Sequence, residues 1–313
     1  MRTCVIGGGG FIGLHVVNAL IVSGRDVLVL GRRVDPPARL SQQARYQSCD
    51  AGDRVALRAA LEGCGEIIDL AHASTPKVTV ANPILELQDN IVPLLNLLEA
   101  AQDLPDLRKL LVASSGGTVY GIASDLPISE DHPTSPVSSY GITKLVVERY
   151  ALIHHLIKGL PSTVVRPANA YGPGQKPFTG QGFIATAMGM ALSGKPVTIF
   201  GAGDTIRDYI HVRDVASGLV AALSGGLSGE AYNIGTAVGL SNLDVVESIK
   251  AIAVRENIPV EVNRVDARGI DVPANILSYE KLRAHTGWRP RETFEAGLSE
   301  MWQEMKLIMA RYE

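Results

Sequence analysis

The stretch Gly7-Gly8-Gly9-Gly10-Phe11-Ile12-Gly13 follows directly on the apolar run Thr3-Cys4-Val5-Ile6. An apolar run, a glycine turn and an amphipathic segment predict a strand, a turn and a helix. Gly7, Gly10 and Gly13 stand at G-x-x-G-x-x-G spacing. In that pattern the first glycine makes a tight turn, the second lets the backbone approach a pyrophosphate, and the third lets the helix pack on the strand. The start of the helix also favours phosphate through its free N–H groups and partial positive charge. We therefore predict dinucleotide binding here, and the alternative is a glycine-rich turn without a ligand.

The composition is typical of an enzyme with a large core. The chain has 313 residues, of which 46% are hydrophobic and 19% are charged, enough for one large α/β unit or two packed lobes. The net charge of −3 and the lack of a basic block argue against a nucleic-acid partner. No apolar stretch reaches membrane-spanning length, and the first residues do not read as a signal peptide. We therefore expect no association with a membrane.

The three cysteines, Cys4, Cys49 and Cys64, show neither C-x-x-C spacing nor a disulfide framework. Cys4 lies in the first predicted strand and is most simply a small core residue. This cysteine usage favours a reducing, cytoplasmic location. No cluster of Cys, His and Asp has metal-ligand spacing, so we predict no metal site.

Strands and helices alternate up to about residue 170. The expected strands are 3–6, 26–30, 66–71, 109–113 and 163–166, and the expected helices after the first are 53–61, 84–101 and 139–157. Pro93 predicts a kink inside the helix 84–101. Nearly continuous apolar strands with intervening helices indicate a doubly wound parallel sheet, in which ligands bind at the carboxyl ends of the strands. His72, at one such strand end, is interpreted as a structural residue, and the alternative is a contact with the sugar.

The segment Tyr140-Gly-Ile-Thr-Lys144 lies in the predicted helix 139–157. Residues i and i+4 share a helical face, so the lysine ammonium can lie near the phenol, directly or through a ribose. An unperturbed phenol has a pKa of about 10, and a nearby cation favours the phenolate. The pair then provides a base for an alcohol near neutral pH. The alternative is an interfacial tyrosine with a solvated lysine, but the glycine turn and the serine-rich strand end at Ser114 favour the catalytic interpretation.

With these features the chain resembles the extended short-chain dehydrogenase/reductase family, and within it the UDP-glucose 4-epimerase-like NAD-dependent epimerases/dehydratases. The resemblance covers nearly the whole chain, and its motifs occur in the family's order. Beyond the glycine turn and the Tyr140/Lys144 pair, these motifs are Ser114-Ser115-Gly116-Gly117-Thr118-Val119-Tyr120-Gly121, Arg166-Pro167-Ala168-Asn169-Ala170-Tyr171-Gly172-Pro173, Arg207-Asp208-Tyr209-Ile210-His211-Val212, Tyr232-Asn233-Ile234-Gly235, Arg268-x-x-Asp271-Val272 and Gly287-Trp288-x-Pro290.

The resemblance implies a Rossmann-type dinucleotide-binding domain over residues 1–170 and a smaller C-terminal lobe, mainly residues 171–313, that holds a nucleotide sugar. Segments near 207–238 are expected to return to the first domain. The Pro- and Gly-rich stretch 167–182 marks the boundary or a binding loop.

The resemblance also implies site residues. In relatives the position of Asp50 contacts the adenine, and that of Asn90 lies near the cofactor. The implied cofactor-binding residues are Gly7, Gly10, Phe11, Ile12, Gly13, Arg32, Asp50, Ala51, Leu70, Ala71, Asn90, Ser114, Tyr140 and Lys144. The implied substrate-binding residues are Ser115, Gly116, Asn169, Thr198, Phe200, Arg207, Arg268 and Asp271.

In relatives, the positions of Asn169 and Arg207 grip the diphosphate, and a guanidinium fork does suit phosphate oxygens. The alternative for Arg207 is a surface salt bridge with Asp208 or Asp204. The family's phosphate and ribose contacts fall at Arg268 and Asp271, and Thr198 and Phe200 lie on the strand that meets uracil.

The first departure from the family is Gly116, where relatives carry a Ser or Thr whose hydroxyl binds the reacting sugar hydroxyl. If residues 114 to 118 are extended, then 114, 116 and 118 share a face, and Thr118 becomes the best-placed hydroxyl. Related 4,6-dehydratases carry a glutamate general base at the Thr118 position. Threonine cannot do that work, which disfavours a dehydratase.

The second departure is Gly31-Arg32-Arg33, where NAD-specific members place an Asp at the position of Gly31 to bind the ribose diol. Its absence, with arginines following, would suit the 2′-phosphate of NADP. Epimerases of this kind usually keep NAD tightly bound, so both cofactors stay open.

Together these features predict a sugar-nucleotide 4-epimerase acting on a UDP-hexose. Tyr140 takes the proton of the sugar 4-hydroxyl as hydride passes to the nicotinamide, and Lys144 holds the ribose and lowers the Tyr140 pKa. Thr118 is the third catalytic candidate. The alternatives are an NADPH-dependent reductase of a 4-keto-6-deoxy nucleotide sugar, a 4,6-dehydratase and a non-catalytic NAD(P)-sensing protein.

The family pairs two helices per subunit, here 84–101 and 139–157, so we expect a homodimer.

Overall fold

The computed structural model describes residues 1–73, 83–267 and 271–310. Its larger part is a seven-stranded sheet in the order β10-β6-β5-β4-β1-β2-β3. Every neighbouring pair in this sheet is parallel. The strands are β1 (Arg2–Ile6), β2 (Asp26–Gly31), β3 (Arg45–Ser48), β4 (Cys64–Asp69), β5 (Lys109–Ala113), β6 (Ser162–Pro167) and β10 (Ala231–Ile234). The predicted doubly wound α/β fold is confirmed.

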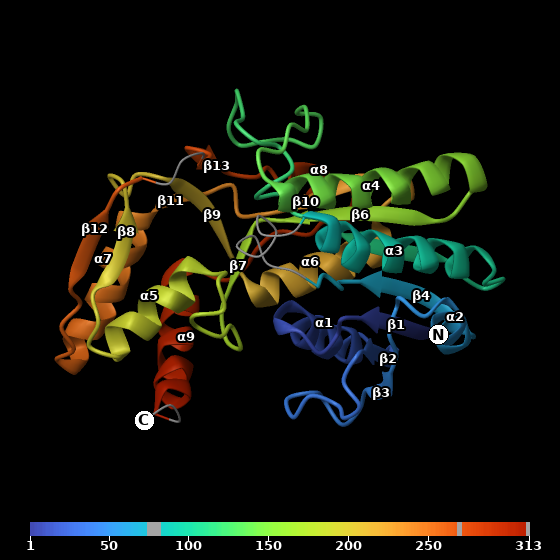
Figure 1. Cartoon of the computed structure of the whole chain (residues 1–313), viewed down its shortest axis with the longest axis horizontal. Helices are drawn as coiled ribbons and strands as arrows, with labels where there is room; N and C mark the ends of the chain where they lie inside the picture. The colour runs from blue at the N-terminus through green and yellow to red at the C-terminus, as the bar shows by residue number, and fades with distance from the viewer. Residues whose placement is uncertain (74–82, 268–270, 311–313) are drawn as a thin grey trace.

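Helices cover both faces of this sheet (Figure 1). One face carries α1 (Phe11–Val22) and α6 (Val212–Gly225), and the other carries α2 (Arg54–Leu61), α3 (Pro83–Gln102) and α4 (Ser139–Lys158). Because side chains alternate along a strand, Val5 enters the core on the α1 face, whereas Cys4 and Ile6 enter the core on the opposite face. Both faces of a central strand are therefore apolar, as the nearly continuous hydrophobic runs predicted.

The smaller part of the molecule, at the left of Figure 1, has two small sheets and its own core. In one sheet β9 (Ile206–His211) pairs with β7 (Asn169–Tyr171), β11 (Gly239–Ser241) and β13 (Ala274–Asn275), and in the other β8 (Val197–Phe200) pairs with β12 (Val262–Val265). The remaining elements of the smaller part are α5 (Phe183–Leu192), α7 (Asn242–Ala253), the 3₁₀ turn η1 (Val254–Glu256) and α9 (Phe294–Met309). Helix α8 (Glu280–Thr286) packs on α6 and β10 of the larger part.

The chain crosses between the two parts at the carboxyl ends of the large sheet. Strand β6 ends at Pro167, and β7 of the small lobe begins at Asn169. Strand β9 of the small lobe leads directly into α6, which packs on the large sheet. The carboxyl edge of the large sheet therefore faces the small lobe, and this edge is where open α/β sheets bind ligands.

Helix α3 continues across Pro93. None of the helices in residues 1–73, 83–267 and 271–310 is long and apolar enough to cross a membrane. In the same ranges no group of three or more His, Cys, Asp or Glu side chains could hold a metal ion.

Candidate active site

The glycine turn between β1 and α1 is closed to larger residues at two positions. Gly7 has a φ of +77°, and a Cβ atom there would lie 3.0 Å from the backbone nitrogen of Ala71. A Cβ atom on Gly13 would lie 2.4 Å from the carbonyl oxygen of Gly7. Leu70 and Ala71, at the end of β4, therefore pack directly against the turn. The other candidates of this region, at the start of α1, are Gly10, Phe11 and Ile12.

The end of β2 lies beside Tyr46 on the edge strand β3. A Cβ atom on Gly31 would lie 3.0 Å from the Tyr46 hydroxyl oxygen, and that hydroxyl donates to the carbonyl oxygen of Arg33 at 2.8 Å. The side chain of Arg32 is exposed. Gly31, the position where NAD-specific relatives place an acidic residue, therefore lies next to the phenol of Tyr46. The exposed cation of Arg32 follows it in the chain.

Asp50, Ala51 and Asn90 hold the backbone around this edge of the sheet. Asp50 Oδ1 accepts from Gly52 N at 2.9 Å, and the carbonyl oxygen of Ala51 accepts from Asn96 Nδ2 at 3.1 Å. Asn90 Oδ1 accepts from Ala73 N at 2.8 Å, and its Nδ2 donates to the carbonyl oxygen of Glu86 at 2.8 Å. The buried Asn90 therefore ties the segment after β4 to helix α3.

Tyr140 and Lys144 share one buried face of α4, as the i, i+4 spacing predicts. Helix α4 begins after Ser138, whose hydroxyl accepts from Gly141 N at 3.1 Å. Lys144 Nζ lies 5.9 Å from the centre of the Tyr140 ring and donates to the carbonyl oxygen of Ala113 at 3.0 Å. Ala113 is the last residue of β5, so the dyad stands at the carboxyl edge of the sheet.

The protonation of the dyad differs from the expectation. Burial, reinforced by the carboxylate of Glu86, raises the pKa of Tyr140 to about 12. Burial also lowers the pKa of Lys144 to about 8, although Asp69, Glu86 and Glu148 oppose that shift. The net lowering of the Tyr140 pKa that the sequence predicts is therefore not seen in this structure, where burial of the phenol and the carboxylate of Glu86 set the direction of the shift.

A buried polar network lies behind the dyad. The Ser114 hydroxyl donates to Glu148, one turn after Lys144 on α4. Arg166 donates to the same carboxylate through Nε at 2.9 Å and Nη2 at 2.7 Å. Its Nη1 donates to the Tyr120 hydroxyl at 2.8 Å. Ser114, a cofactor-binding candidate, thus has its hydroxyl engaged within the protein.

Three members of that network were not singled out as site residues from the sequence. They are Glu148, Arg166 and Tyr120. Arg166 and Tyr120 lie in motifs that carry the resemblance, and Glu148 follows Lys144 at the same spacing that joins Lys144 to Tyr140. Extending the i, i+4 pattern by one turn would have found the glutamate.

The segment after β5 is a turn, so the expected extended geometry of residues 114–118 is wrong. Thr118 N and Val119 N both donate to the carbonyl oxygen of Ser115, at 3.2 and 3.1 Å. The turn brings Ser115 and Thr118 to either side of Gly116 and Gly117. The Thr118 hydroxyl makes a long 3.5 Å contact with the carbonyl oxygen of Ser115. In the described part of the chain the Ser115 hydroxyl has no hydrogen bond.

Gly116 has no room for the hydroxyl that relatives carry. A Cβ atom there would lie 2.3 Å from Leu277 Cδ1 and 2.9 Å from the carbonyl oxygen of Arg166. The glycine carbonyl oxygen accepts from Asn275 Nδ2 at 3.0 Å. The departure from the family pattern therefore has a packing cause, since a leucine fills the space next to the glycine.

The small lobe places Asn169 and Arg207 on adjacent strands. A Cβ atom on Gly117 would lie 3.7 Å from Asn169 Nδ2, so Asn169 flanks the 115–118 turn. Arg207 Nη2 lies 2.5 Å from Asp271 Oδ1, and its Nη1 donates to the carbonyl oxygen of Val272 at 2.7 Å. Two substrate-binding candidates, Arg207 and Asp271, therefore pair with each other. Arg268, the other cationic candidate of this group, lies outside the described residues.

The alternative partners considered for Arg207 do not pair with it. Asp208 is buried. Because side chains alternate along strand β9, it points to the opposite face from its neighbour Arg207. It accepts from Thr236 N at 3.0 Å and from Leu277 N at 3.1 Å. Burial raises the pKa of Asp208 to about 6. Asp208 thus anchors the small lobe to the segment that contains Leu277.

Thr198 and Phe200 lie on β8, next to Asn263 and Val265 of β12. Both are partly buried. Within the described part of the chain, no hydrogen bond or ring contact joins either side chain to the Tyr140–Lys144 dyad or to Arg207. Their place in a substrate site therefore stays a prediction.

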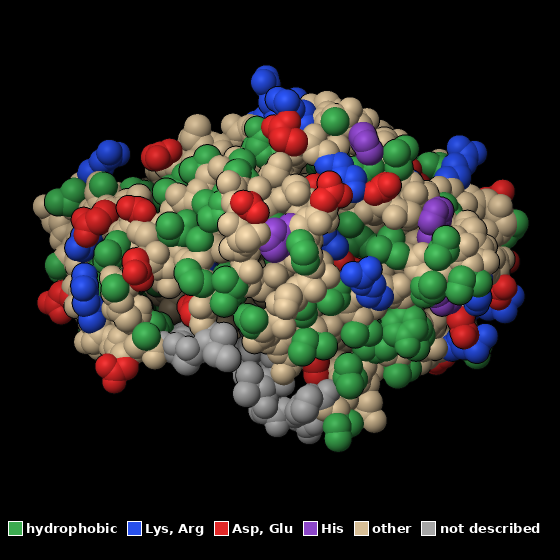
Figure 2. Space-filling model, turned by 90° about the horizontal axis from the view of Figure 1, so that it is seen from above, with side chains coloured by type: hydrophobic (Ala, Val, Ile, Leu, Met, Phe, Trp, Pro, Cys, Tyr) green, Lys and Arg blue, Asp and Glu red, His purple; other side chains and the backbone are tan. Residues whose placement is uncertain are grey.

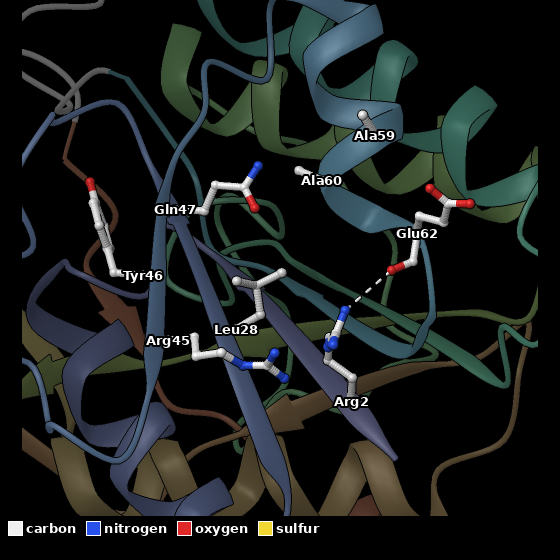
Figure 3. A pocket seen from close by; sticks show the side chains of 8 residues that line it. All are labelled: Arg2, Leu28, Arg45, Tyr46, Gln47, Ala59, Ala60 and Glu62. Atoms are coloured by element: carbon white, nitrogen blue, oxygen red, sulfur yellow. Dashed lines mark hydrogen bonds between the residues drawn. The ribbon is translucent and has the colours of Figure 1, made fainter.

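Two surface hollows lie at the opposite, amino edge of the large sheet. One, of about 500 Å³, is lined by Arg2, Arg45 and Glu62 among others, and Figure 3 shows the Arg2 side chain bonded to the carbonyl oxygen of Glu62. The other, of about 700 Å³, includes Cys64 and Leu104. Since both open at the starts of strands, we do not assign the chemistry to either.

Comparisons with known proteins identify the family of this chain. The NAD dependent epimerase/dehydratase family matches residues 3–235. The UDP-glucose 4-epimerase of Mycolicibacterium smegmatis is 32% identical over 306 residues, which cover 96% of each chain. The structure of UDP-glucose 4-epimerase from Thermotoga maritima with UDP-glucose is similar at a TM-score of 0.92 and 31% identity, over 99% of this chain and 100% of that chain. The Thermus thermophilus UDP-glucose 4-epimerase in complex with NAD has a TM-score of 0.88 and 31% identity, over 98% and 99%.

Proposed function

Because this chain belongs to the NAD dependent epimerase/dehydratase family, within the extended short-chain dehydrogenases/reductases, we propose that it is a 4-epimerase of a UDP-hexose. The observation that carries the proposal is the buried Tyr140–Lys144 pair at the carboxyl edge of the sheet. This pair adjoins the glycine turn, since Ala71 touches Gly7 and the next residue, His72, packs against the Tyr140 ring.

In the proposed reaction Tyr140 holds and returns the proton of the sugar 4-hydroxyl. Lys144, fixed by the carbonyl oxygen of Ala113, stabilises the phenolate by its charge. The hydroxyls of Ser115 and Thr118 flank the turn at the same edge, and we propose Thr118 as the donor to the reacting sugar oxygen. A bound nicotinamide would supply the hydride acceptor and donor.

The residues of the turn fit a dinucleotide. The backbone of Gly7 and Gly13 leaves no space for side chains, and the start of α1 presents free N–H groups. We propose NAD as the cofactor, as in the Thermus thermophilus relative. NADP is the alternative, and the exposed Arg32 together with the missing acid at Gly31 favours it.

The small lobe supplies the groups that we propose for the nucleotide diphosphate. Arg207 offers a guanidinium on β9, and Asn169 lies on the adjacent strand β7 next to the turn at Gly117. The relative from Thermotoga maritima was solved with UDP-glucose, which supports a UDP-sugar. Phosphate oxygens would replace the Asp271 carboxylate as partners of Arg207.

We also propose a symmetric homodimer that buries the outer face of α3 and α4. Large apolar side chains on this face are exposed, and Figure 2 shows hydrophobic side chains gathered over this region at its lower right. They are Ile84, Leu87, Val92, Ile142, Ile153, Leu156 and Ile157. Contiguous exposed apolar faces often mark protein–protein interfaces, and a symmetric pairing would cover this one. Light scattering at micromolar concentration should give twice the chain mass.

The proposed function is tested by incubating the purified protein with UDP-glucose, UDP-N-acetylglucosamine and UDP-glucuronic acid and following the sugars by NMR. The expected result is conversion to the 4-epimer without net consumption of cofactor. Net oxidation of NADPH with a 4-keto-6-deoxy sugar would indicate the reductase, and loss of water would indicate a 4,6-dehydratase. No conversion of any sugar, with nucleotide still bound, would favour a sensing protein. The cofactor released on denaturation identifies NAD or NADP.

A further inference from the structure

Glu86 is a buried carboxylate near Tyr140 that the sequence motifs do not include. It lies in the first turn of α3, and its side chain is 2% exposed. Neither carboxylate oxygen has a hydrogen-bond partner within the described residues. A buried ionised carboxylate without partners is strongly unfavourable. Such a group indicates that a ligand completes its surroundings.

One imidazole ring separates Glu86 from Tyr140. His72 Nε2 lies 3.3 Å from Glu86 Oε1, and the His72 ring stands edge-on to the Tyr140 ring with their centres 4.9 Å apart. The contact with Glu86 is not an ion pair, because burial and the charge of Lys144 lower the pKa of His72 to about 2. The neutral imidazole therefore does not compensate the charge of Glu86.

The charge of Glu86 acts on both members of the dyad. It raises the pKa of Tyr140, second only to burial, and it opposes the lowering of the Lys144 pKa. Among the described residues, the titratable groups that face the dyad are Glu148 on α4, Asp69 at the end of β4, His72 after it, and Glu86 on α3.

These groups leave an excess of negative charge beside the dyad. Arg166 pairs with Glu148, so among the described residues around the dyad only the ammonium of Lys144 faces the carboxylates of Asp69 and Glu86. Two carboxylates against one cation favour the binding of a further positive charge. The oxidised nicotinamide ring is a cation, whereas the reduced ring is neutral.

We propose that Glu86 makes this site prefer the oxidised, cationic nicotinamide over the reduced form, and that through His72 it acts as a positioning residue for the Tyr140 proton. The inference rests on the proposed function for the identity of the cofactor. It also deepens that function, because an epimerase begins and ends each turnover with the oxidised cofactor, whereas a reductase must bind the reduced form first.

The test measures which redox form the protein retains. The purified protein is equilibrated with mixtures of NAD⁺ and NADH, freed of unbound nucleotide by gel filtration, and analysed for the bound ratio. Glu86→Gln should lower the bound ratio of oxidised to reduced cofactor by about tenfold, the effect of one pKa unit of charge interaction. Glu86→Asp, which retains the charge, should restore most of the preference.

A matched control removes a buried carboxylate elsewhere. Glu66 accepts from the Thr3 hydroxyl at 2.6 Å and from Arg25 Nε at 2.8 Å, and it lies near the start of β4. Glu66→Gln should lower stability without changing the bound ratio. If Glu86→Gln does not fold, Glu86→Met removes the charge together with the need for a hydrogen-bond partner.

Two outcomes separate the inference from the proposed function. If the wild-type protein binds neither nucleotide, the proposed function fails. If it binds both and the folded Glu86 variants keep the wild-type ratio, the inference about Glu86 is overturned.

A second readout is the acid limb of the pH–rate profile, which should move to lower pH in Glu86→Gln because the Tyr140 pKa falls when the neighbouring negative charge is removed.

Discussion

The two sides of the candidate site are built in different ways. On the large-sheet side Tyr140 and Lys144 are buried, and Lys144 donates to the carbonyl oxygen of Ala113. Behind them Ser114, Glu148 and Arg166 hydrogen-bond to one another. On the small-lobe side Arg207 is 18% exposed and its partner Asp271 is 47% exposed. The first side has fixed geometry, whereas the second relies on an ion pair that solvent screens.

This difference separates chemistry from binding. Groups that transfer a proton must stand within a fraction of an ångström of their places, and buried hydrogen bonds hold them there. A cation that receives a phosphate must exchange one partner for another, so a partly exposed pair suits it. Changes on the large-sheet side should therefore alter turnover or folding, and changes on the small-lobe side should alter affinity.

The strongest test of this comparison is Tyr140→Phe. Removing the phenolic oxygen should lower turnover by ~10²–10⁴-fold, the usual worth of a general base, and leave the affinity for UDP unchanged. Tyr209→Phe is the control from the small lobe, since its hydroxyl makes only a 3.4 Å contact with Asn242 Oδ1. Steady-state kinetics and UDP titration measure both variants. Near-native epimerisation by Tyr140→Phe would contradict the proposed mechanism.

The next effect concerns the turn that joins the two sides. Thr118→Val keeps the side-chain shape and deletes the hydroxyl, and it should lower turnover by ~10²-fold if that hydroxyl binds the reacting oxygen. Ser115→Ala is the matched variant on the other side of the same turn. A silent Thr118→Val with a large loss in Ser115→Ala would move the role to Ser115. Gly116→Ser should not restore a family-like site, because Leu277 occupies the space.

The third prediction uses the buried charge of Lys144. Its pKa is about 8 in the folded protein, against 10.5 for an ordinary lysine, so the folded state binds fewer protons than the unfolded state between these values. Stability from this residue should therefore rise with pH through that window, by about 1–3 kcal/mol. Urea unfolding at pH 8 and pH 10 should show that the free energy of unfolding increases more with pH in the wild type than in Lys144→Met. Equal changes in both proteins would mean that Lys144 is more solvated than the structure indicates.

The smallest effect is expected on the small-lobe side. Arg207→Ala should weaken UDP-sugar binding by about tenfold, as loss of one charge-assisted contact does, and should leave turnover at saturation almost unchanged. Arg213→Ala serves as the control, because Arg213 pairs at the surface with Glu292 and Glu300. A large fall in turnover with unchanged affinity in Arg207→Ala would overturn the division between the two sides.

Local patterns predicted the parts of the site that lie close together in the chain. The i, i+4 spacing of Tyr140 and Lys144 placed both on one helical face, and the glycine spacing placed Gly7 and Gly13 at a closed turn. The extended geometry assumed for residues 114–118 was wrong, because the chain turns to satisfy Thr118 N and Val119 N with one carbonyl oxygen. Nothing in the local pattern of small residues distinguishes a strand end from such a turn.

The sequence by itself determined the sheet, its glycine turn and the Tyr140–Lys144 pair. These features depend on the periodicity and spacing of residues within a single helix, strand or turn. Only the tertiary structure decided that Leu277 excludes a side chain at Gly116, that Asp271 holds Arg207, and that Glu86 and His72 meet Tyr140. It also decided the protonation of the dyad, with the pKa of Tyr140 raised to about 12. These contacts join segments far apart in the chain, and desolvation depends on everything packed around a group, so neither follows from spacing.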